Sequence, residues 1–256
     1  MKLPENRFKR ALAARQQQIG LWSSLASPVS VELLAGTGFD WLLLDMEHAP
    51  NELPMVNSQL QAMAASKTHP IVRPPWNDMV TIKRLLDVGA QTLLIPYVET
   101  EEQARDAVAF TRYPPQGVRG YASSSRASGY GRVADYAKQC ASELCVLVQV
   151  ESRLGLDNLE RIAAVDGIDG VFIGPGDLAA ALGHVGEISH PEVQSVIEDT
   201  IGRIVATGKP AGILTPNETL ARRYIELGCM FTAVGSDIGI LGRGAEQLAA
   251  RFRSSN

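Results

Sequence analysis

Apolar runs of strand length alternate along this 256-residue chain with amphipathic stretches of helix length. The runs are rich in Leu, Val and Ile, whereas the stretches between them carry apolar residues at helical spacing and often begin at Ser, Thr, Asp, Asn or Pro. The pattern predicts strands at residues 18–24, 41–46, 70–74, 92–97, 144–151, 170–174, 210–214 and 231–235. It predicts helices at residues 28–36, 52–65, 78–87, 100–111, 157–164, 191–206, 217–226 and 243–253.

The strict alternation of strand and helix is typical of an α/β protein with a parallel sheet, because parallel strands need a crossover between them. Eight such units in roughly 250 residues favour closure into a (β/α)8 TIM barrel over an open sheet. The chain has no low-complexity tract and no Pro/Gly-rich linker that would divide it. We therefore expect residues 1–256 to form a single barrel domain.

Polar residues suited to chemistry follow several of the apolar runs. In a TIM barrel the active site is built from the carboxyl ends of the strands, so residues at these positions are candidates for a catalytic rim. The candidates are Asp45, Glu47, His48, Arg73, Glu151 and Asp177.

Composition narrows the possible partners. The formal net charge is −4, and the 24 Lys and Arg residues are dispersed, so nothing indicates a nucleic-acid surface. The first residues are charged, and no apolar stretch reaches the length of a membrane span, so we expect a cytoplasmic protein. Cys140, Cys145 and Cys229 have no C-x-x-C spacing, which argues against a disulfide framework or a structural zinc site.

A long loop at residues 113–132, rich in Gly, Ser and Arg, interrupts the alternation. Loops of this length in compact domains are usually functional or disordered. One interpretation is that this loop only extends over the surface or contacts another subunit. The other is that Arg119 or Arg126 reaches an anionic substrate or a neighbouring site.

Glu151 and Asp177 are candidate metal ligands. They end successive strands, so a barrel brings them to neighbouring places on the rim, where two carboxylates and additional oxygen ligands suit Mg²⁺ or Mn²⁺. The alternative is that each caps a helix or pairs with Arg153. The segment IGPGDLAAALG leaves a strand and enters a short helix, so the amides of residues 176–178 are expected to form a carboxylate pocket. Together, a metal and a carboxylate pocket suit a 2-oxo acid.

His48 and Arg73 are the other candidates for chemistry. An imidazole within reach of Asp45 or Asp87 would be held in one tautomer and could act as a general base near neutral pH. His48 could equally be an ordinary polar loop residue. Arg73 precedes two prolines and could stabilise oxyanion charge, or it could form a salt bridge to Asp45 or Glu47.

The sequence lacks the residues and motifs that several other catalytic mechanisms require. None of the six lysines lies at the carboxyl end of a predicted strand, as a Schiff-base aldolase would require. No G-x-S-x-G, G-x-G-x-x-G or P-loop motif is present, so serine hydrolase, nicotinamide and nucleotide-phosphate chemistry lose support. Metal-assisted enolate chemistry remains the leading hypothesis.

The candidate residues also lie in motifs that resemble a known family. The motifs are L-x-D-x-E-H (43–48), V-R-P (72–74), D-x-G-A-Q (87–91), Q-V-E (149–151) and F-I-G-P-G-D-L (172–178). In this order they resemble the class II, metal-dependent pyruvate aldolases of the 4-hydroxy-2-oxoheptanedioate and 2-keto-3-deoxy-L-rhamnonate aldolase family, over residues 20–242. The resemblance implies a modified TIM barrel, commonly hexameric, in which neighbouring subunits exchange the C-terminal helix. Residues 243–253 suit such an arm.

The resemblance further implies cleavage of a 4-hydroxy-2-oxo acid into pyruvate and an aldehyde, with Mg²⁺, Mn²⁺ or Co²⁺ as the cofactor. Glu151 and Asp177 match the family's metal ligands. Arg73 matches the arginine that holds the 2-oxo oxygen and the developing enolate. The amides of Gly176 and Asp177 match those that bind the pyruvate carboxylate, and Gln149 would lie beside the oxo group.

His48 matches the family's proposed base, assisted by the carboxylates at Asp45 and Asp87. Trp22 and Leu214 match positions that shape the aldehyde side of the site. The chain departs from the usual G-P-A-D-L-S motif at Gly176 and Ala179, which could alter substrate preference.

Two alternative interpretations stay open at this point. A lyase acting on a malyl or citramalyl thioester shares the barrel and the metal chemistry but would need a basic groove for coenzyme A. A barrel that has lost activity and serves in an assembly fits poorly with so complete a rim. The sequence does not identify the aldehyde or choose among the three metals.

Overall fold

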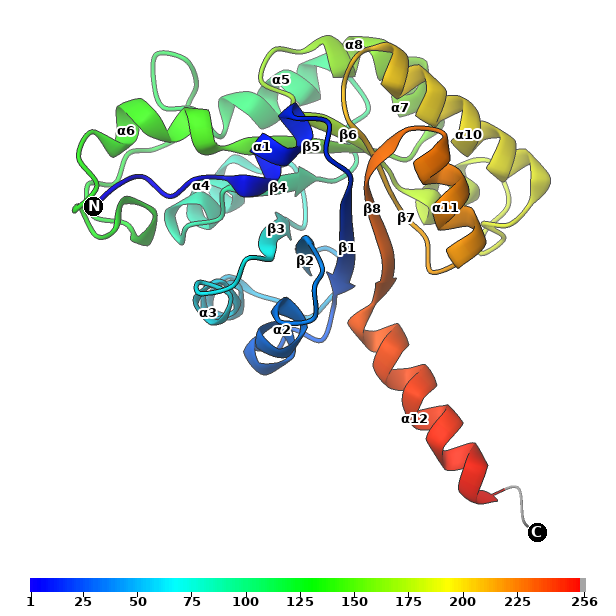
Figure 1. Cartoon of the computed structure of the whole chain (residues 1–256). Coiled ribbons are helices and arrows are strands. Elements are labelled where there is room, and N and C mark those ends of the chain that lie inside the picture. Colours follow the sequence, from blue (N-terminus) through cyan, green and yellow to red (C-terminus); the bar gives the residue numbers. More distant parts are fainter. Residues whose placement is uncertain (254–256) are drawn as a thin grey trace.

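The computed structural model describes residues 1–253 and has a closed barrel of eight parallel strands in sequential order (Figure 1). The predicted TIM-type fold is confirmed, and every predicted strand is present. The strands are β1 (Gln18–Ser23), β2 (Trp41–Asp45), β3 (His69–Arg73), β4 (Thr92–Ile95), β5 (Cys145–Val150), β6 (Gly170–Ile173), β7 (Ala211–Leu214) and β8 (Cys229–Ser236).

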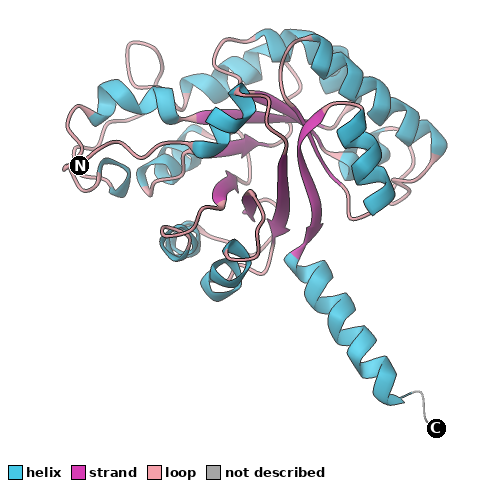
Figure 2. Cartoon of the chain, in the orientation of Figure 1, coloured by secondary structure: helices cyan, strands magenta, loops and turns pink. Residues whose placement is uncertain are grey.

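Helices surround the barrel and alternate with its strands, as Figure 2 shows in cyan and magenta. The longer helices are α2 (Pro28–Ala35), α3 (Leu53–Ala62), α4 (Met79–Asp87), α5 (Glu101–Ala109), α10 (Pro191–Ala206), α11 (Glu218–Glu226) and α12 (Asp237–Arg253). The shorter ones are α1 (Arg7–Ala13), α6 (Tyr136–Gln139), α7 (Arg153–Asp157), α8 (Leu159–Ala164) and α9 (Pro175–Ala181), with 3-10 turns η1 (Arg126–Ser128) and η2 (Cys140–Glu143). None of the described helices is long and apolar enough to cross a membrane.

Side-chain caps explain why several helices begin where the sequence predicts. Ser27, Asp78, Thr100 and Asn217 each accept a hydrogen bond from a backbone N–H in the first turn of the helix that follows. The predicted helix at 157–164 is instead two short helices, α7 and α8, which meet at Asn158. The Asn158 side chain donates to the backbone oxygen of Glu99, so it serves the neighbouring loop rather than a continuous helix.

Two apolar layers hold the barrel together. The outer layer lies between the strands and the helices, and the inner layer fills the barrel itself. Helix α1 was not predicted, because it is short and three of its seven residues are charged, yet Phe8 and Leu12 pack into the inner layer. The ring of Phe8 lies 6.1 Å from that of Trp41 and 5.8 Å from that of Phe231. Helix α1 therefore contributes to the barrel core through two residues.

His69 begins β3, at the barrel face opposite the strand carboxyl ends, and only 8% of its surface is exposed. Its Nε2 atom lies 2.8 Å from Oγ1 of Thr92, and its ring stacks on that of Phe8. Burial, with a smaller contribution from Arg7, lowers the pKa of His69 to about 4. The folded protein therefore holds this histidine neutral.

We expect His69 to make stability depend on pH. In the unfolded chain this histidine takes up a proton below about pH 6.5, whereas in the folded protein it stays neutral down to about pH 4. The free energy of unfolding therefore falls as the pH decreases from about 6.5 to 4. Between pH 7.5 and 5 the loss is about 2 kcal/mol. Urea unfolding of the wild-type protein and of His69→Gln at these two pH values measures the loss. An equal loss in the two proteins would contradict this assignment, whatever the stability of the variant at neutral pH.

Helix α12 leaves the barrel and projects away from it (Figure 1). Asp237 fixes its start: the buried carboxylate accepts hydrogen bonds from the Ser23 hydroxyl and from the backbone N–H groups of Ser24 and Leu25. The helix begins at Asp237, six residues before the predicted start. Its apolar side chains are exposed, namely Ile238, Ile240, Leu241, Leu248 and Phe252.

Candidate active site at the carboxyl ends of the strands

Asp45 and Arg73 form a buried pair where β2 and β3 end. The two residues are register partners in the sheet, so their side chains leave adjacent strands at the same level. Arg73 donates from Nε and Nη2 to the two carboxylate oxygens of Asp45, at 2.9 and 2.7 Å. Burial alone would raise the pKa of Asp45, but the hydrogen bonds and charge of Arg73 outweigh it and lower the pKa. The pair is a fixed, charged unit at neutral pH.

Two further contacts orient the Arg73 guanidinium. It lies over the ring of Trp22, 4.9 Å from the ring centroid, while the Trp22 indole N–H donates to Asp45 at 3.2 Å. Its Nη1 atom lies 2.7 Å from Oε2 of Glu47, outside hydrogen-bonding geometry. The salt bridges considered for Arg73 are therefore present with both carboxylates. They position the guanidinium and leave Nη1 without a hydrogen-bond partner among the described residues.

Glu47 interacts electrostatically with Arg73 and also with Asp177, a proposed metal ligand on α9. Burial raises the pKa of Glu47, Arg73 opposes this effect, and the charges of Asp45 and Asp177 add to it. Only 12% of its side chain is exposed. Glu47 therefore lies within electrostatic reach of both Arg73 and the proposed metal ligand Asp177.

Glu151 follows β5 directly and is buried, with 2% of its surface exposed. The backbone N–H of Tyr97 donates to Oε1 at 2.9 Å, and the side-chain amide of Gln149 donates to Oε2. Burial nevertheless raises the pKa of Glu151 to about 7, assisted by the charges of Glu47 and Asp177. A buried carboxylate without a nearby cation is costly, so this position suits a bound positive ion.

Gly174 makes room for the Glu151 carboxylate. A Cβ at residue 174 would lie closer to Oε2 of Glu151 than any two such atoms can approach, and it would also crowd Nε2 of Gln149. We expect Gly174→Ala to displace the carboxylate and weaken divalent-metal binding by about tenfold or more. Calorimetric titration with Mn²⁺ measures this effect. The matched control is Gly176→Ala, because a Cβ at residue 176 meets nothing within 4 Å. Equal affinities in the two variants would contradict the steric argument.

Asp177 lies in the first turn of α9, three residues after Gly174 caps that helix. Among residues 1–253 its carboxylate has no hydrogen-bond or ion-pair partner, and it is half-buried. Pro175 has no N–H, and the N–H of Leu178 donates to the oxygen of Gly174 at 3.0 Å. The expectation of free amides at residues 176–178 is therefore wrong for Leu178, while Gly176 and Asp177 are the two that remain available.

These residues fit a divalent cation. Glu151 and Asp177 offer carboxylate oxygens, which Mg²⁺ and Mn²⁺ prefer. The Glu151 carboxylate is buried beside a glycine that clears space for it, and Asp177 is unpaired in the described chain. Oε1 of Gln149 is also buried without a partner among these residues. The alternative in which Glu151 or Asp177 pairs with Arg153 is wrong, because Arg153 donates to the backbone oxygens of Ala181 and Leu182.

His48 follows Glu47 on the rim and is largely exposed, with 63% of its side chain accessible. Its Nε2 lies 3.9 Å from Oε2 of Glu47. The carboxylate of Asp45 accepts hydrogen bonds from Arg73, Trp22 and the backbone N–H of Glu47, and within residues 1–253 it accepts none from the His48 imidazole. Within this chain the imidazole is free to turn toward a substrate.

Within one chain Asp87 does not reach His48, so its expected assistance stays a prediction for the assembled protein. Asp87 ends α4, where that helix returns to the start of β4, so it lies at the face of the barrel opposite His48. It pairs there with the buried guanidinium of Arg119 at 2.9 Å. The predicted helix at 78–87 is confirmed, and it is the position of Asp87 at the end of this helix that separates it from the strand carboxyl ends.

The two loop arginines also lie away from the rim. Arg119 packs over Tyr113 at 4.6 Å, and none of its surface is exposed. Arg126 donates to the backbone oxygens of Val88 and Leu60. Both residues attach loop 113–132 to the end of α4, so neither reaches the substrate side of its own barrel.

Trp22, one residue before the end of β1, and Leu214, the last residue of β7, lie beside the inner apolar layer. Trp22 is 5% exposed and packs 5.6 Å from the ring of Phe172, whereas Leu214 is half-buried. Gln149 lies on β5 next to Glu151. The structure thus brings Trp22, Leu214 and Gln149 to the rim that carries Arg73 and the two carboxylates.

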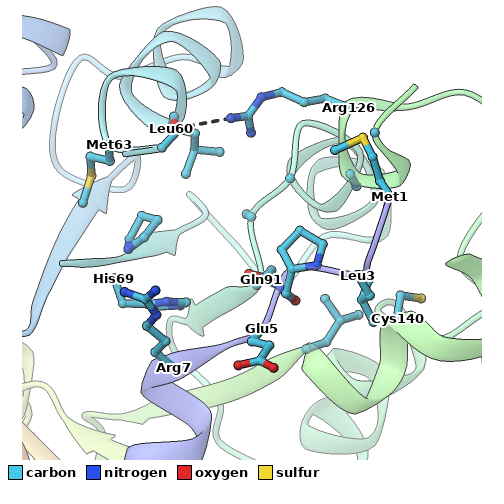
Figure 3. Close-up of a pocket in the computed structure, with 18 of the residues that line it drawn as sticks. Met1, Leu3, Glu5, Arg7, Leu60, Met63, His69, Gln91, Arg126 and Cys140 are labelled. Atoms are coloured by element: carbon cyan, nitrogen blue, oxygen red, sulfur yellow. Dashed lines mark hydrogen bonds between the residues drawn. The ribbon is translucent and has the colours of Figure 1, made fainter. Parts of the chain in front are cut away.

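A cavity of about 620 Å³ opens at the other face of the barrel, where strands begin (Figure 3). Met1, Leu3, Met63, His69 and Gln91 line it, and Arg126 donates to Leu60 at its edge. None of the proposed site residues borders it. This cavity is therefore separate from the candidate site at the strand carboxyl ends.

His184, His190 and Glu192 form a second group with potential ligand atoms close together. The two imidazole rings stack face to face, 3.6 Å apart at 17°. A metal ion binds in the plane of an imidazole, and two stacked rings have no common in-plane position. Nδ1 of His190 also accepts the N–H of Glu192 at the start of α10. This cluster therefore caps a helix in the observed arrangement.

The sequence predicts Glu47 as a rim candidate and as a possible partner of Arg73, and the structure shows that ion pair. The sequence predicts no role for Gly174, which clears space for the Glu151 carboxylate. It places Tyr97 at the end of the predicted strand 92–97, but β4 ends at Ile95, and Tyr97 has a left-handed backbone with φ of 55° that is unusual for a residue other than glycine.

Comparison with known protein families agrees with the barrel fold. The HpcH/HpaI aldolase/citrate lyase family matches residues 18–243, and the chain belongs to this family. It is an aldolase-type enzyme, an aldehyde-lyase.

Particular relatives agree with this classification. A protein named pyruvate aldolase from Rhizobium etli is 56% identical over 252 residues, covering 98% of this chain and 99% of that protein. A protein named 4-hydroxy-2-oxo-heptane-1,7-dioate aldolase from Klebsiella pneumoniae is 60% identical over 248 residues, covering 96% and 94%. The crystal structure of an HpcH/HpaI aldolase/citrate lyase family protein from Burkholderia cenocepacia superposes with a TM-score of 0.93 at 41% identity, covering 97% and 99% of the two chains.

Proposed function

We propose that this enzyme reversibly cleaves a 4-hydroxy-2-oxo acid to pyruvate and an aldehyde, with a divalent metal ion as its cofactor. One observation carries the proposal. Glu151 directly follows β5 and Asp177 lies in the first turn of α9, just after the neighbouring strand β6, with Glu47 within electrostatic reach of Asp177 and of the fixed guanidinium of Arg73. A cation site and a fixed positive charge on one rim suit a substrate whose reaction develops negative charge.

Glu151 and Asp177 would hold the metal ion, which can be Mg²⁺, Mn²⁺ or Co²⁺ with such ligands. When bound, it would supply a Lewis acid that polarises the 2-oxo group and offsets developing negative charge. The free amides of Gly176 and Asp177 at the start of α9 would bind the substrate carboxylate. The side chain of Gln149 would lie beside the oxo group.

Arg73 would donate to the 2-oxo oxygen from Nη1, which forms an ion pair with Glu47 but makes no hydrogen bond among the described residues. His48 would remove the proton of the C4 hydroxyl, after which the C3–C4 bond breaks and the aldehyde leaves. The electron pair of that bond passes to C3 and the oxo oxygen, giving the pyruvate enolate, which Arg73 stabilises until C3 is protonated. Asp45 positions Arg73 throughout, and Trp22 and Leu214 would shape the aldehyde side.

A pyruvate assay distinguishes this activity from that of a thioester lyase, which shares the fold and the metal chemistry. We expect the protein with Mg²⁺ or Mn²⁺ to release pyruvate from racemic 4-hydroxy-2-oxoheptane-1,7-dioate, detected by lactate dehydrogenase. Malyl-coenzyme A should give no product. Cleavage of the thioester alone would contradict the proposal.

Helix α12 supports an assembly with further copies of the chain. Its apolar side chains are exposed, and Val29 and Leu33 on α2 are also exposed, at 72% and 67%. Apolar surface of this extent is usually buried in a contact. We propose that α12 packs on a second copy, in a homo-hexamer such as the family resemblance implies. Such a contact would exchange the C-terminal helix between neighbouring subunits.

A further inference from the structure

The cavity at the face where strands begin has the size of a ligand site (Figure 3). Its volume of about 620 Å³ lies within the range of about 300–1,000 Å³ that small-molecule pockets occupy. Segments far apart in the sequence line it: the start of the chain, the loop between α3 and β3, the loop between α4 and β4, and loop 113–132. The proposed aldolase mechanism uses none of these segments, so the cavity has no role in it.

The charged side chains around this cavity are mainly basic. The basic residues that line it are Arg7, Lys67, Arg126 and Arg132. Among the lining residues that the structure describes, the one carboxylate is that of Glu5, which pairs with Arg10 at 3.0 Å. The cavity therefore has an excess of positive charge, although the formal net charge of the chain is −4.

These four cations have no carboxylate partner within residues 1–253. Arg126 and Arg132 donate to backbone oxygens, which fixes their guanidinium groups without neutralising them. Arg7 and Lys67 are exposed and have no hydrogen bond or ion pair in the described chain. An anionic group in the cavity could therefore accept charge-assisted hydrogen bonds from Arg7 and Lys67 without displacing an internal partner.

His69 adds a buried polar group to the cavity wall. It is 8% exposed, and Figure 3 shows it beside Arg7. Its Nε2 lies 2.8 Å from Oγ1 of Thr92, whereas its Nδ1 has no hydrogen-bond partner within residues 1–253. When the Thr92 hydroxyl donates to Nε2, the proton of the neutral imidazole is on Nδ1. In that tautomer His69 has an N–H to offer to a ligand.

Apolar side chains form much of the remaining wall. Leu60, Met63, Tyr136 and Leu144 are buried and line the cavity, and Leu3 packs against the cluster that contains Tyr136. An inorganic ion would leave this apolar surface in contact with water, whereas a ligand with an apolar or aromatic body would cover it. The combination of apolar wall and unpaired cations suits an organic anion.

We propose that this cavity is a second ligand site, which binds a small organic anion. Arg7 and Lys67 contact its carboxylate or phosphate group, and its apolar body lies against Leu60 and Met63. The site is separate from the rim that carries Glu151, so the inference does not depend on the proposed aldolase function. It also gives loop 113–132 a role, because this loop supplies two of the four cations.

The test is calorimetric titration of the Mg²⁺-supplied protein with two probes, 3-phenylpropanoate and phenyl phosphate. We expect saturable binding of at least one probe at one site per chain, and the tighter probe identifies the preferred anionic group. Lys67→Gln and Arg7→Gln should each weaken binding about tenfold, as for loss of a hydrogen bond to a charged group. Neither substitution breaks an internal contact. The matched control is Arg84→Gln, because Arg84 is exposed on α4 and lies outside the cavity.

Inorganic phosphate and phenol test the two halves of the ligand separately, and each should bind at least about tenfold more weakly than the tighter probe. Equal binding of inorganic phosphate would indicate an adventitious ion only and would overturn the proposal. So would the absence of saturable binding of either probe. Binding that requires Mg²⁺ and is unchanged in Lys67→Gln and Arg7→Gln would assign the probe to the rim and would equally contradict a second site.

Discussion

Asp177→Ala should lose most of its affinity for divalent metal, by about 100-fold or more, and should lose pyruvate enolisation with it. Removal of a carboxylate ligand is expected to cost at least as much as removal of the groups that orient a ligand, which typically costs 10- to 100-fold. Asp177 is suited to this test because it has no partner within residues 1–253, so its loss breaks no internal ion pair. Calorimetric titration with Mn²⁺ measures the affinity.

The control for this substitution is Glu187→Ala. Glu187 is an exposed carboxylate in the loop after α9, so it matches the change in charge without touching the rim. We expect the control to bind metal as the unaltered protein does. Full metal occupancy in Asp177→Ala would show that Glu151 has a different partner ligand.

Arg73→Ala should slow pyruvate enolisation by about 10²- to 10³-fold, the usual effect of removing a preorganised donor to a developing oxyanion. Metal affinity should change much less, because Arg73 contacts Asp45 and Glu47 rather than the proposed ligands. The measurement is the rate of deuterium exchange at the pyruvate methyl under saturating metal.

Removal of Arg73 also leaves two carboxylates near each other without their cation, which destabilises a buried site. Arg73→Lys therefore accompanies it: lysine keeps the charge but loses the paired N–H donors that fit Asp45. We expect slowed exchange in a folded protein. Arg222→Ala, at an exposed pair with Glu218, serves as the control. Wild-type exchange in Arg73→Lys and Arg73→Ala alike would remove Arg73 from enolate stabilisation.

The barrel could be predicted because its strands have a strong local signal. Buried on both faces, they appear as continuous apolar runs such as WLLLD and CVLVQV, separated by capped helices. Helix α1 was not predicted, because Phe8 and Leu12, in a short and charged segment, are too few to give a recognisable helical periodicity. Their role becomes visible only when Phe8 meets Trp41 and Phe231 across the barrel.

The position of a candidate site residue could be predicted when that residue lies at, or just after, the end of a strand. Arg73, Glu151 and Asp177 come to one rim, since parallel strands all end at the same face of the barrel. Asp87 did not, because the D-x-G-A-Q motif lies at a helix end. The position of Tyr97 depends on a left-handed backbone and on a contact with a tryptophan from another loop, which no local pattern encodes.

The central claim is that this rim enolises pyruvate with the help of a divalent metal ion. The most direct measurement is NMR of deuterium exchange at the pyruvate methyl, with protein stripped of metal and then supplied with Mg²⁺ or Mn²⁺. The account predicts negligible exchange in stripped protein and rapid exchange after either metal is restored. Equal exchange rates with and without metal, or no exchange with metal and a non-reacting aldehyde analogue present, would contradict it.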